Sequence, residues 1–304
     1  MGNAKGERPV SKAEVVAGNR ALVGESPVWD ERDGSLLWVD ILRGEVHRFR
    51  PREDDDRLVA RLPVPVGAVA TCRSSGLVVA AGMGFALLDE ASGELTHLAT
   101  AGRGDRMNDA RCDPAGRLWG GTLTLEHRPR AAALYRLAPD GRLITVLDDV
   151  TLSNGLAWSP DGTRMYYADT VTERVDVFDF DIETGGVRGR RTFVDLHDTP
   201  GRPDGLAMDA EGGLWVAMAR GGTVRRFAPS GRLDEVVDLP LPYVTSCAFG
   251  GERLEDLFVT TLCAGLGEAE LARYPEAGAV LRIPNIGVAG LPAARYAGTS
   301  GGAR

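Results

Sequence analysis

The sequence predicts an all-β protein: a six-bladed β-propeller with four-stranded antiparallel blades around a central channel. Three observations favour this fold. The chain has 39 glycines in 304 residues, about 13% against a usual ~7%, which indicates many tight turns between short strands. A hairpin pattern recurs six times. The segments between hairpins read as further strands, and none has the amphipathic pattern over about ten or more residues that a βαβ fold would need.

Each repeat consists of an apolar strand, a polar turn containing glycine and a second apolar strand. One apolar position of the repeat is occupied in turn by Trp29, Cys72, Cys112, Trp158, Met208 and Phe249. The steps between these residues are 43, 40, 46, 50 and 41 positions, each the length of one blade. Further strands are expected at 133–137, 174–179 and 223–227, and the acidic stretch 53–56 is expected to be a solvated turn.

The chain is expected to form one domain, 13–299, between polar tails 1–12 and 300–304. A ring of blades leaves exposed strand edges unless both chain ends complete the last blade. We therefore expect residues 13–16 to pair with strands around 279–283.

Composition excludes several classes of function. Hydrophobic residues make up 43% and charged residues 26% of the chain, a balance typical of a soluble globular protein. The formal net charge of −8 argues against binding nucleic acid or an anionic membrane. Residues 1–12 lack the apolar core of a signal peptide, so a cytoplasmic location is expected. The protein is expected to be a monomer or a weak homodimer. The four cysteines are too scattered for a zinc site or a disulfide framework.

A polar column precedes the aligned apolar position by four residues. Its members are Glu25, Ala68, Asn108, Asn154, Asp204 and Thr245. Equivalent positions in a propeller share one radial orientation, and these begin the innermost strands, so their side chains converge on the channel. Polar residues also suit a water-filled channel, but Glu25 and Asp204 would repel each other with no cationic residue in the column.

A divalent cation resolves this repulsion. Carboxylate and amide oxygens without Cys or His form a hard site, which suits Ca²⁺ first, with Mg²⁺, Mn²⁺ and Zn²⁺ as alternatives. Arg106 enters the third repeat just before Asn108, and Glu126 lies on the loop that returns to the same face. These three side chains offer hydrogen bonds to a polyhydroxylated ligand; an exposed Arg106–Glu126 ion pair is the alternative. Asp40 and Asp169, which end second strands, are expected to cap turns rather than bind metal.

Several longer motifs carry a family resemblance. They are GESPVWDERDGSLLWVDI from Gly24, DRMNDARCDPAGRLWGGTL from Asp105, LSNGLAWSPDGTRMYYADT from Leu152, PDGLAMDAEGGLWVA from Pro203 and TSCAFGG from Thr245. With these motifs the chain resembles the regucalcin (senescence marker protein)/gluconolactonase family of metal-dependent six-bladed lactonases, over about residues 15–298.

The resemblance implies a function and a set of roles. The implied metal ligands are Glu25, Asn154 and Asp204, with Asp204 also transferring protons, and the implied substrate contacts are Arg106, Asn108 and Glu126. The implied reaction is hydrolysis of a gluconolactone-like sugar lactone to its aldonic acid by a carboxylic ester hydrolase. The alternative to Asp204 as the base is a hydroxide bound to the metal, with Asp204 accepting a hydrogen bond. The alternative functions are a lactonase or esterase for a less polar substrate and a non-catalytic calcium-binding module.

Overall fold

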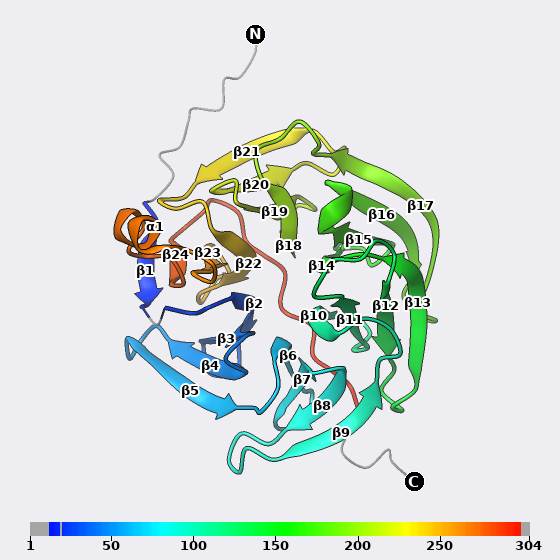
Figure 1. Cartoon of the computed structure of the whole chain (residues 1–304). Helices are drawn as coiled ribbons and strands as arrows, with labels where there is room; N and C mark the ends of the chain where they lie inside the picture. Colours follow the sequence, from blue (N-terminus) through cyan, green and yellow to red (C-terminus); the bar gives the residue numbers. More distant parts are fainter. Residues whose placement is uncertain (1–11, 19, 299–304) are drawn as a thin grey trace.

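Six four-stranded antiparallel sheets surround a central channel in the computed structural model, which describes residues 12–18 and 20–298 (Figure 1). The predicted six-bladed propeller is confirmed. The predicted tails lie outside the described residues, apart from Lys12. Neither helix within the described ranges is long and apolar enough to span a bilayer.

The first three blades follow one another along the chain, each running from the channel outward. Blade 1 contains β2 (Gly24–Asp30), β3 (Ser35–Asp40), β4 (Glu45–Arg50) and β5 (Asp55–Arg61). Blade 2 contains β6 (Val66–Thr71), β7 (Leu77–Ala81), β8 (Gly84–Leu88) and β9 (Leu95–Thr100). Blade 3 contains β10 (Arg106–Cys112), β11 (Leu118–Leu123), β12 (Ala132–Leu137) and β13 (Leu143–Val150).

The next three blades complete the ring. Blade 4 contains β14 (Ser153–Trp158), β15 (Arg164–Asp169), β16 (Arg174–Asp181) and β17 (Gly186–Asp195). Blade 5 contains β18 (Arg202–Met208), β19 (Leu214–Ala219), β20 (Thr223–Phe227) and β21 (Leu233–Asp238). Blade 6 contains β22 (Val244–Gly250), β23 (Asp256–Thr261), β24 (Val280–Ile283) and, outermost, β1 (Glu14–Ala17).

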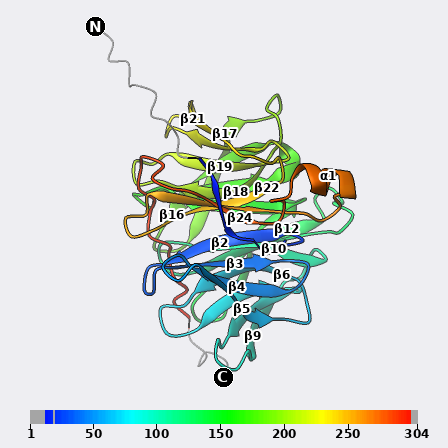
Figure 2. The ribbon, with the colours of Figure 1, turned by 90° about the vertical axis from the view of Figure 1, so that its left-hand side faces the viewer.

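The two ends of the chain close the ring in blade 6, as predicted. Strand β1 pairs antiparallel with β24, with Glu14 opposite Arg282. Both strands lie at the left-hand rim in Figure 1, the side that faces the viewer in Figure 2. Arg282 Nη1 lies 3.2 Å from Glu14 Oε1. The pairing covers the edge of β24 that an open ring would leave exposed.

Every innermost strand carries a register irregularity near the position where the polar column was predicted. In β18, for example, the pairing shifts between Pro203 and Leu206, which places Asp204 in a β-bulge; the other five inner strands shift at the corresponding place. A bulge bends its strand and re-aims a side chain. Six such bulges therefore form one level around the channel.

The bulges correct the predicted alignment in blade 2. Cys72 N donates to Gly76 O just as Asp113 N donates to Arg117 O, so Cys72 is equivalent to Asp113 and not to its neighbour Cys112. The polar column therefore contains Gly67 in place of Ala68. In the sequence repeats, Cys72 aligns with Cys112 because both are apolar residues near a hairpin turn.

Glycines at the bulges let neighbouring inner strands approach closely. A Cβ added to Gly205 would lie 1.9 Å from Ser246 Oγ, and one added to Gly155 would lie 2.5 Å from Asp204 O. A Cβ on Gly67 would lie 2.5 Å from Asn108 O. Since no side chain fits at these distances, these glycines set the spacing between blades.

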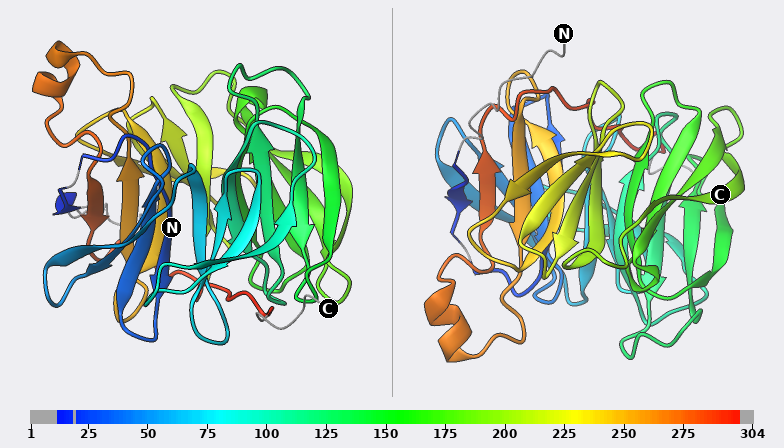
Figure 3. Two further views of the ribbon diagram at one scale, coloured as in Figure 1. Left: turned by 60° about the horizontal axis from the view of Figure 1, so that its bottom comes forward. Right: turned by 90° about the horizontal axis from the view of Figure 1, so that it is seen from above.

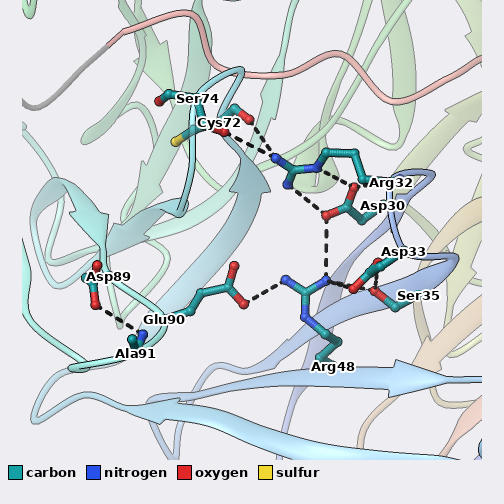
Figure 4. A network of polar contacts seen from close by, with 10 residues as sticks. All are labelled: Asp30, Arg32, Asp33, Ser35, Arg48, Cys72, Ser74, Asp89, Glu90 and Ala91. Carbon is teal, nitrogen blue, oxygen red and sulfur yellow. Dashed lines mark hydrogen bonds and ion pairs between the residues drawn. The ribbon is translucent and has the colours of Figure 1, made fainter.

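Two arginines, the buried Arg48 and the exposed Arg32, join blades 1 and 2 (Figure 4). Arg48 donates from Nη1 to Asp33 Oδ2 at 3.0 Å and from Nη2 to Glu90 Oε2 at 2.7 Å. Arg32 binds Asp30 and also donates to the backbone oxygen of Ser74. Each guanidinium thus spans two sheets with several donors in one plane, which resists sliding of one blade past the next.

The acidic stretch 53–56 is only partly a turn. Asp55 begins β5, and Asp56 Oδ1 accepts a hydrogen bond from Trp38 Nε1 at 2.9 Å. His47 stacks on the Trp38 ring at 4.2 Å, and its Nδ1 lies 3.3 Å from Asp56 Oδ2. Its Nε2 lies 3.2 Å from Glu45 Oε2.

The two faces of the propeller differ in what covers them. Helix α1 (Glu268–Arg273) follows β23, and the 3-10 helix η1 (Thr170–Thr172) follows β15, so both lie on the face where the inner strands begin. The C-terminal strap, defined here as residues 289–297, crosses the other face (Figure 3). Neither the helices nor the strap was predicted from the sequence.

We expect Gly205→Ala to lower the free energy of unfolding by about 1–3 kcal/mol, because its methyl group must displace Ser246. Gly102 has open space around it, and Gly102→Ala should change stability by less than about 0.5 kcal/mol. Urea denaturation of both variants measures the difference. Equal stability of the two variants would contradict the spacing role of Gly205.

We expect the stabilisation by His47 to depend on pH. Burial disfavours the imidazolium, but Asp56 and Glu45 outweigh burial and raise the pKa of His47 above its usual 6.5. The benefit of the charged ring is therefore complete below pH 6.5 and lost as the pH rises through the higher folded-state pKa. The stability gap between wild type and His47→Gln should narrow from pH 6 to pH 9, and the exposed variant His97→Gln serves as the control. A stability gap for His47→Gln that widens with pH would contradict a raised pKa of His47 in the folded protein.

Candidate functional site

Four of the predicted axis residues lie together at the beginning of the inner strands. Glu25 is in β2, Asn108 in β10, Asn154 in β14 and Asp204 in β18, and their exposed fractions are only 5%, 7%, 4% and 8%. The local reason is the bulge at each position, which aims the side chain into the channel.

A strained residue fixes the orientation of Glu25. Ser26, which follows it in the bulge of β2, has a φ of 49°, a left-handed conformation that non-glycine residues rarely adopt. Ser26 N donates to Glu25 Oε2 at 2.8 Å, and Ser26 Oγ accepts from Val69 N of the next blade at 3.2 Å. These bonds hold the bulge and leave the second oxygen of Glu25 available.

The amide of Asn154 is oriented by its neighbours. Its Nδ2 donates to Thr170 Oγ1 at 2.7 Å, and that hydroxyl donates to Pro203 O at 2.8 Å. Asn154 Oδ1 accepts from Asn108 Nδ2 at 3.1 Å and keeps one further lone pair. Thr170, in η1, thus connects the amide of blade 4 to the strand that carries Asp204.

Arg106 and Asn108 form a second polar pair. Arg106 Nη1 donates to Asn108 Oδ1 at 2.8 Å, and Asn108 Nδ2 also donates to Ser153 O at 2.7 Å. Arg106 Nε is buried without a partner among the described residues. Burial lowers the pKa of Arg106, partly offset by the charge of Glu25. The site therefore presents an unused donor next to the carboxylates.

The carboxylates of the site share a poorly compensated charge. Burial, then the charges of Asp204 and Asp109, raise the pKa of Glu25 well above its usual value. Burial and Asp109 likewise raise the pKa of Asp204. Asp204 Oδ1 is buried with no hydrogen-bond partner among the described residues. An orphaned carboxylate oxygen beside other carboxylates is a suitable ligand for a cation.

The chemistry of the donor set also fits a hard cation. Glu25 and Asp204 supply carboxylates and Asn154 supplies an amide oxygen, the ligand types that Ca²⁺ and Mg²⁺ bind. Within the described ranges, no three His, Cys, Asp or Glu side chains form a metal site of their own. A site here therefore depends on the amide as its third ligand.

The remaining predicted residues fall outside this cluster. Thr245 Oγ1 donates to Gly24 O at 2.6 Å, so it joins blades 6 and 1. Glu126 is exposed on its loop and makes no hydrogen bond or ion pair with the described residues, so the alternative of an Arg106–Glu126 ion pair is not observed. Asp40 accepts from Leu22 N at 2.8 Å, and Asp169 accepts from Thr151 N at 2.8 Å. Both cap turns, as expected.

Two residues of the site, Asp109 and Thr170, were not predicted from the sequence. Asp109 follows Asn108 in the bulge of β10 and is 4% exposed. Burial raises its pKa, with the charge of Arg111 acting in the opposite direction. Its signal in the sequence was a carboxylate one position after the polar column. Thr170 gave no repeat signal, because it lies on a loop.

Comparison with known proteins shows which family the chain resembles. Residues 23–263 match a family model described as the SMP-30/gluconolactonase/LRE-like region. The chain is 40% identical over 294 residues to regucalcin from Danio rerio, covering 94% of this chain and 99% of that protein. The structure of regucalcin from Agrobacterium tumefaciens, described as a calcium-binding protein, superposes with a TM-score of 0.89 at 29% identity, covering 94% of this chain and 97% of that one. A gluconolactonase from Xanthomonas campestris shares the fold, with a TM-score of 0.74 at 23% identity and coverage of 90% and 89%.

We expect Thr170→Val to weaken divalent-cation binding several-fold without unfolding the protein. The valine keeps the shape of the threonine but removes the hydroxyl that orients Asn154, and positioning groups of this kind typically contribute about tenfold or more to metal affinity. Thr172→Val is the matched control, because among the described residues the Thr172 hydroxyl bonds only to Asp169 O. Calorimetric titration with Ca²⁺ and Mn²⁺ measures both variants. Unchanged affinity in Thr170→Val would show that this hydroxyl does not position the amide.

Proposed function

Because the chain belongs to the SMP-30/gluconolactonase/LRE-like family, we propose that it is a divalent-metal-dependent lactonase that hydrolyses a sugar lactone to the aldonic acid. The observation that carries the proposal is the buried, unpartnered oxygen of Asp204. It lies among carboxylates whose charge is uncompensated, next to an arginine–amide pair that offers polar contacts.

The proposed cation ligands are Glu25, Asn154 and Asp204, and the proposed cation is Ca²⁺. The description of a similar regucalcin as a calcium-binding protein supports this choice. When bound, the cation would act as a Lewis acid on the lactone carbonyl and stabilise charge that develops on its oxygen.

Asp204 is proposed to move protons during hydrolysis. The attacking water forms a bond to the carbonyl carbon and gives up a proton to the carboxylate as the ring C–O bond breaks. The same proton then neutralises the leaving ring oxygen. Burial and the charge of Asp109 raise the pKa of Asp204, and a bound cation would act in the opposite direction. One carboxylate oxygen would hold the cation, and the other would accept the proton.

Arg106, Asn108 and Glu126 are proposed to bind the hydroxyl groups of the sugar. Arg106 and Asn108 are held by each other, so they need little reordering on binding. Glu126 is exposed on the loop after β11, where a substrate seated against Arg106 would meet it. Its carboxylate accepts hydrogen bonds only, which complements the donors of Arg106.

A less polar lactone or ester is the second candidate substrate. Leu125, next to Glu126 on the same loop, is 70% exposed, and an apolar side chain at the rim would favour such a substrate. A calcium-binding module without catalysis is the third reading. Such a module needs the ligands of the cation but gives no use for the partly buried Arg106–Asn108 pair.

The test is a panel of lactones assayed after chelation and after return of single divalent ions. We expect turnover of aldonolactones such as gluconolactone. This turnover should disappear with chelator and return with Ca²⁺ or another hard cation. Saturation by aliphatic lactones alone would favour the less polar substrate. Cation binding without turnover of any lactone or ester would indicate the module.

We expect Arg106→Ala and Glu126→Ala to raise the KM for gluconolactone by about fivefold or more, since one hydrogen bond to the substrate contributes on the order of 1 kcal/mol. Cation affinity should be retained, because neither side chain is a proposed ligand. The exposed neighbour Arg103 supplies the control variant Arg103→Ala. An equal rise in KM for valerolactone, which has no hydroxyl groups, would contradict sugar recognition.

We expect Asp204→Asn to lower kcat by about 10²- to 10⁴-fold even at saturating cation, because the amide keeps a ligand oxygen but loses its basicity. Cation occupancy must be measured directly by calorimetry, so that lost binding is separated from lost chemistry. Asp148→Asn, at an exposed position of β13, is the matched control. Wild-type kcat in the saturated Asp204→Asn protein would exclude proton transfer by this residue.

A further inference from the structure

A second cavity lies at the opposite end of the channel from the proposed lactone site. Its volume is about 260 Å³, close to the lower end of the ~300–1,000 Å³ typical of small-molecule sites. Its walls are the distal halves of the inner strands, and its roof is formed by Leu291, Pro292, Ala293 and Ala294 of the C-terminal strap. The strap crosses the channel in Figure 1.

The strap is anchored on both sides of this cavity. On one side Leu291 N donates to Met208 O at 3.3 Å and Gly290 N donates to Leu254 O at 2.7 Å. On the other side Tyr296 N donates to Thr71 O at 2.9 Å. Because the roof is held at both ends by blades that lie across the ring from each other, the cavity is a formed feature of the fold.

One charged residue, Arg111, interrupts a mostly apolar wall. The same position of all six inner strands lines the cavity and is occupied by Val28, Ala70, Arg111, Ala157, Ala207 and Ala248. Five of these side chains are small and aliphatic. Trp29, Trp158 and Phe249 line the next level outward.

Arg111 is half-buried at this position and lacks an ion-pair partner among the described residues. Its side chain makes no hydrogen bond or ion pair with residues 12–18 or 20–298. Asp109 is affected by its charge, but the two side chains do not form an ion pair. A guanidinium stays charged at any ordinary pH, so placing it in an apolar wall is unfavourable unless an anion approaches it.

We propose that this cavity binds a small amphipathic monocarboxylate, with its carboxylate on Arg111 and its apolar body between the two tryptophans and the strap. At ~30 Å³ for each water-sized group, the volume holds about nine non-hydrogen atoms, which corresponds to a six- to eight-carbon acid. The ligand is opposite in character to a sugar lactone. The carboxylates of the first site repel anions, and the second cavity offers few partners for hydroxyl groups.

The test compares octanoate with octanamide, its uncharged counterpart, by calorimetric titration of the full-length protein in the presence of chelator. Octanoate should bind at least about tenfold more tightly than octanamide, because only the carboxylate forms a charge-assisted bond to Arg111. Arg111→Met should remove this preference, and Arg188→Met, at an exposed position of β17, should keep it. Ala207→Leu, which fills the cavity, should weaken both ligands.

Three results would overturn the proposal. They are no saturable octanoate binding up to about 1 mM, equal affinity of octanoate for wild type and Arg111→Met, or loss of octanoate binding in Glu25→Gln, which would place the acid at the first site. If Arg111→Met does not fold, two other measurements still test the proposal: the comparison of octanoate with octanamide, and the affinity of Ala207→Leu for both ligands. Lactone turnover is measured separately, so the two sites are tested independently.

Discussion

The close approach of six inner strands around the channel is the constraint on which the rest of the molecule depends. Bulges at one level of these strands bend each of them, and glycines at 67, 155 and 205 remove the side chains that would hold the blades apart. The consequence is that polar groups from four different blades come within hydrogen-bonding or electrostatic range of one another. No single blade contains the site, so its geometry is as rigid as the packing between blades.

This arrangement concentrates negative charge at one end of the channel, while Arg111 lines the cavity toward the other. Glu25, Asp109 and Asp204 are buried together, while Arg111 lies two residues beyond Asp109 on the same strand. Folding energy from the apolar interfaces between blades must sustain this separation, because each of these groups would be better solvated in the unfolded chain. Unfavourable burial of charged groups is typical of binding sites rather than of structural cores.

The fold and the four axis residues could be predicted because a propeller converts a sequence period into a fixed radial position. Glu25, Asn108, Asn154 and Asp204 were identifiable from that period alone. The register of blade 2 was not, since Cys72 and Cys112 look alike in sequence and only backbone hydrogen bonds distinguish their positions. Asp109 and Thr170 were missed for a related reason. A bulge directs two consecutive residues toward one site, and a loop residue has no equivalent in the other repeats.

The closure of blade 6 also determines how the chain can fold. Glu14 and Arg282 meet in the outermost pair of strands although 268 positions separate them in sequence. Chains dominated by such distant contacts fold slowly, because a large loss of chain entropy precedes the last stabilising pairing. During synthesis β1 stays unpaired until β24 has left the ribosome. Ring closure is therefore a late event in folding, and the incomplete ring with its open edge is the stage at which this protein is most exposed to aggregation.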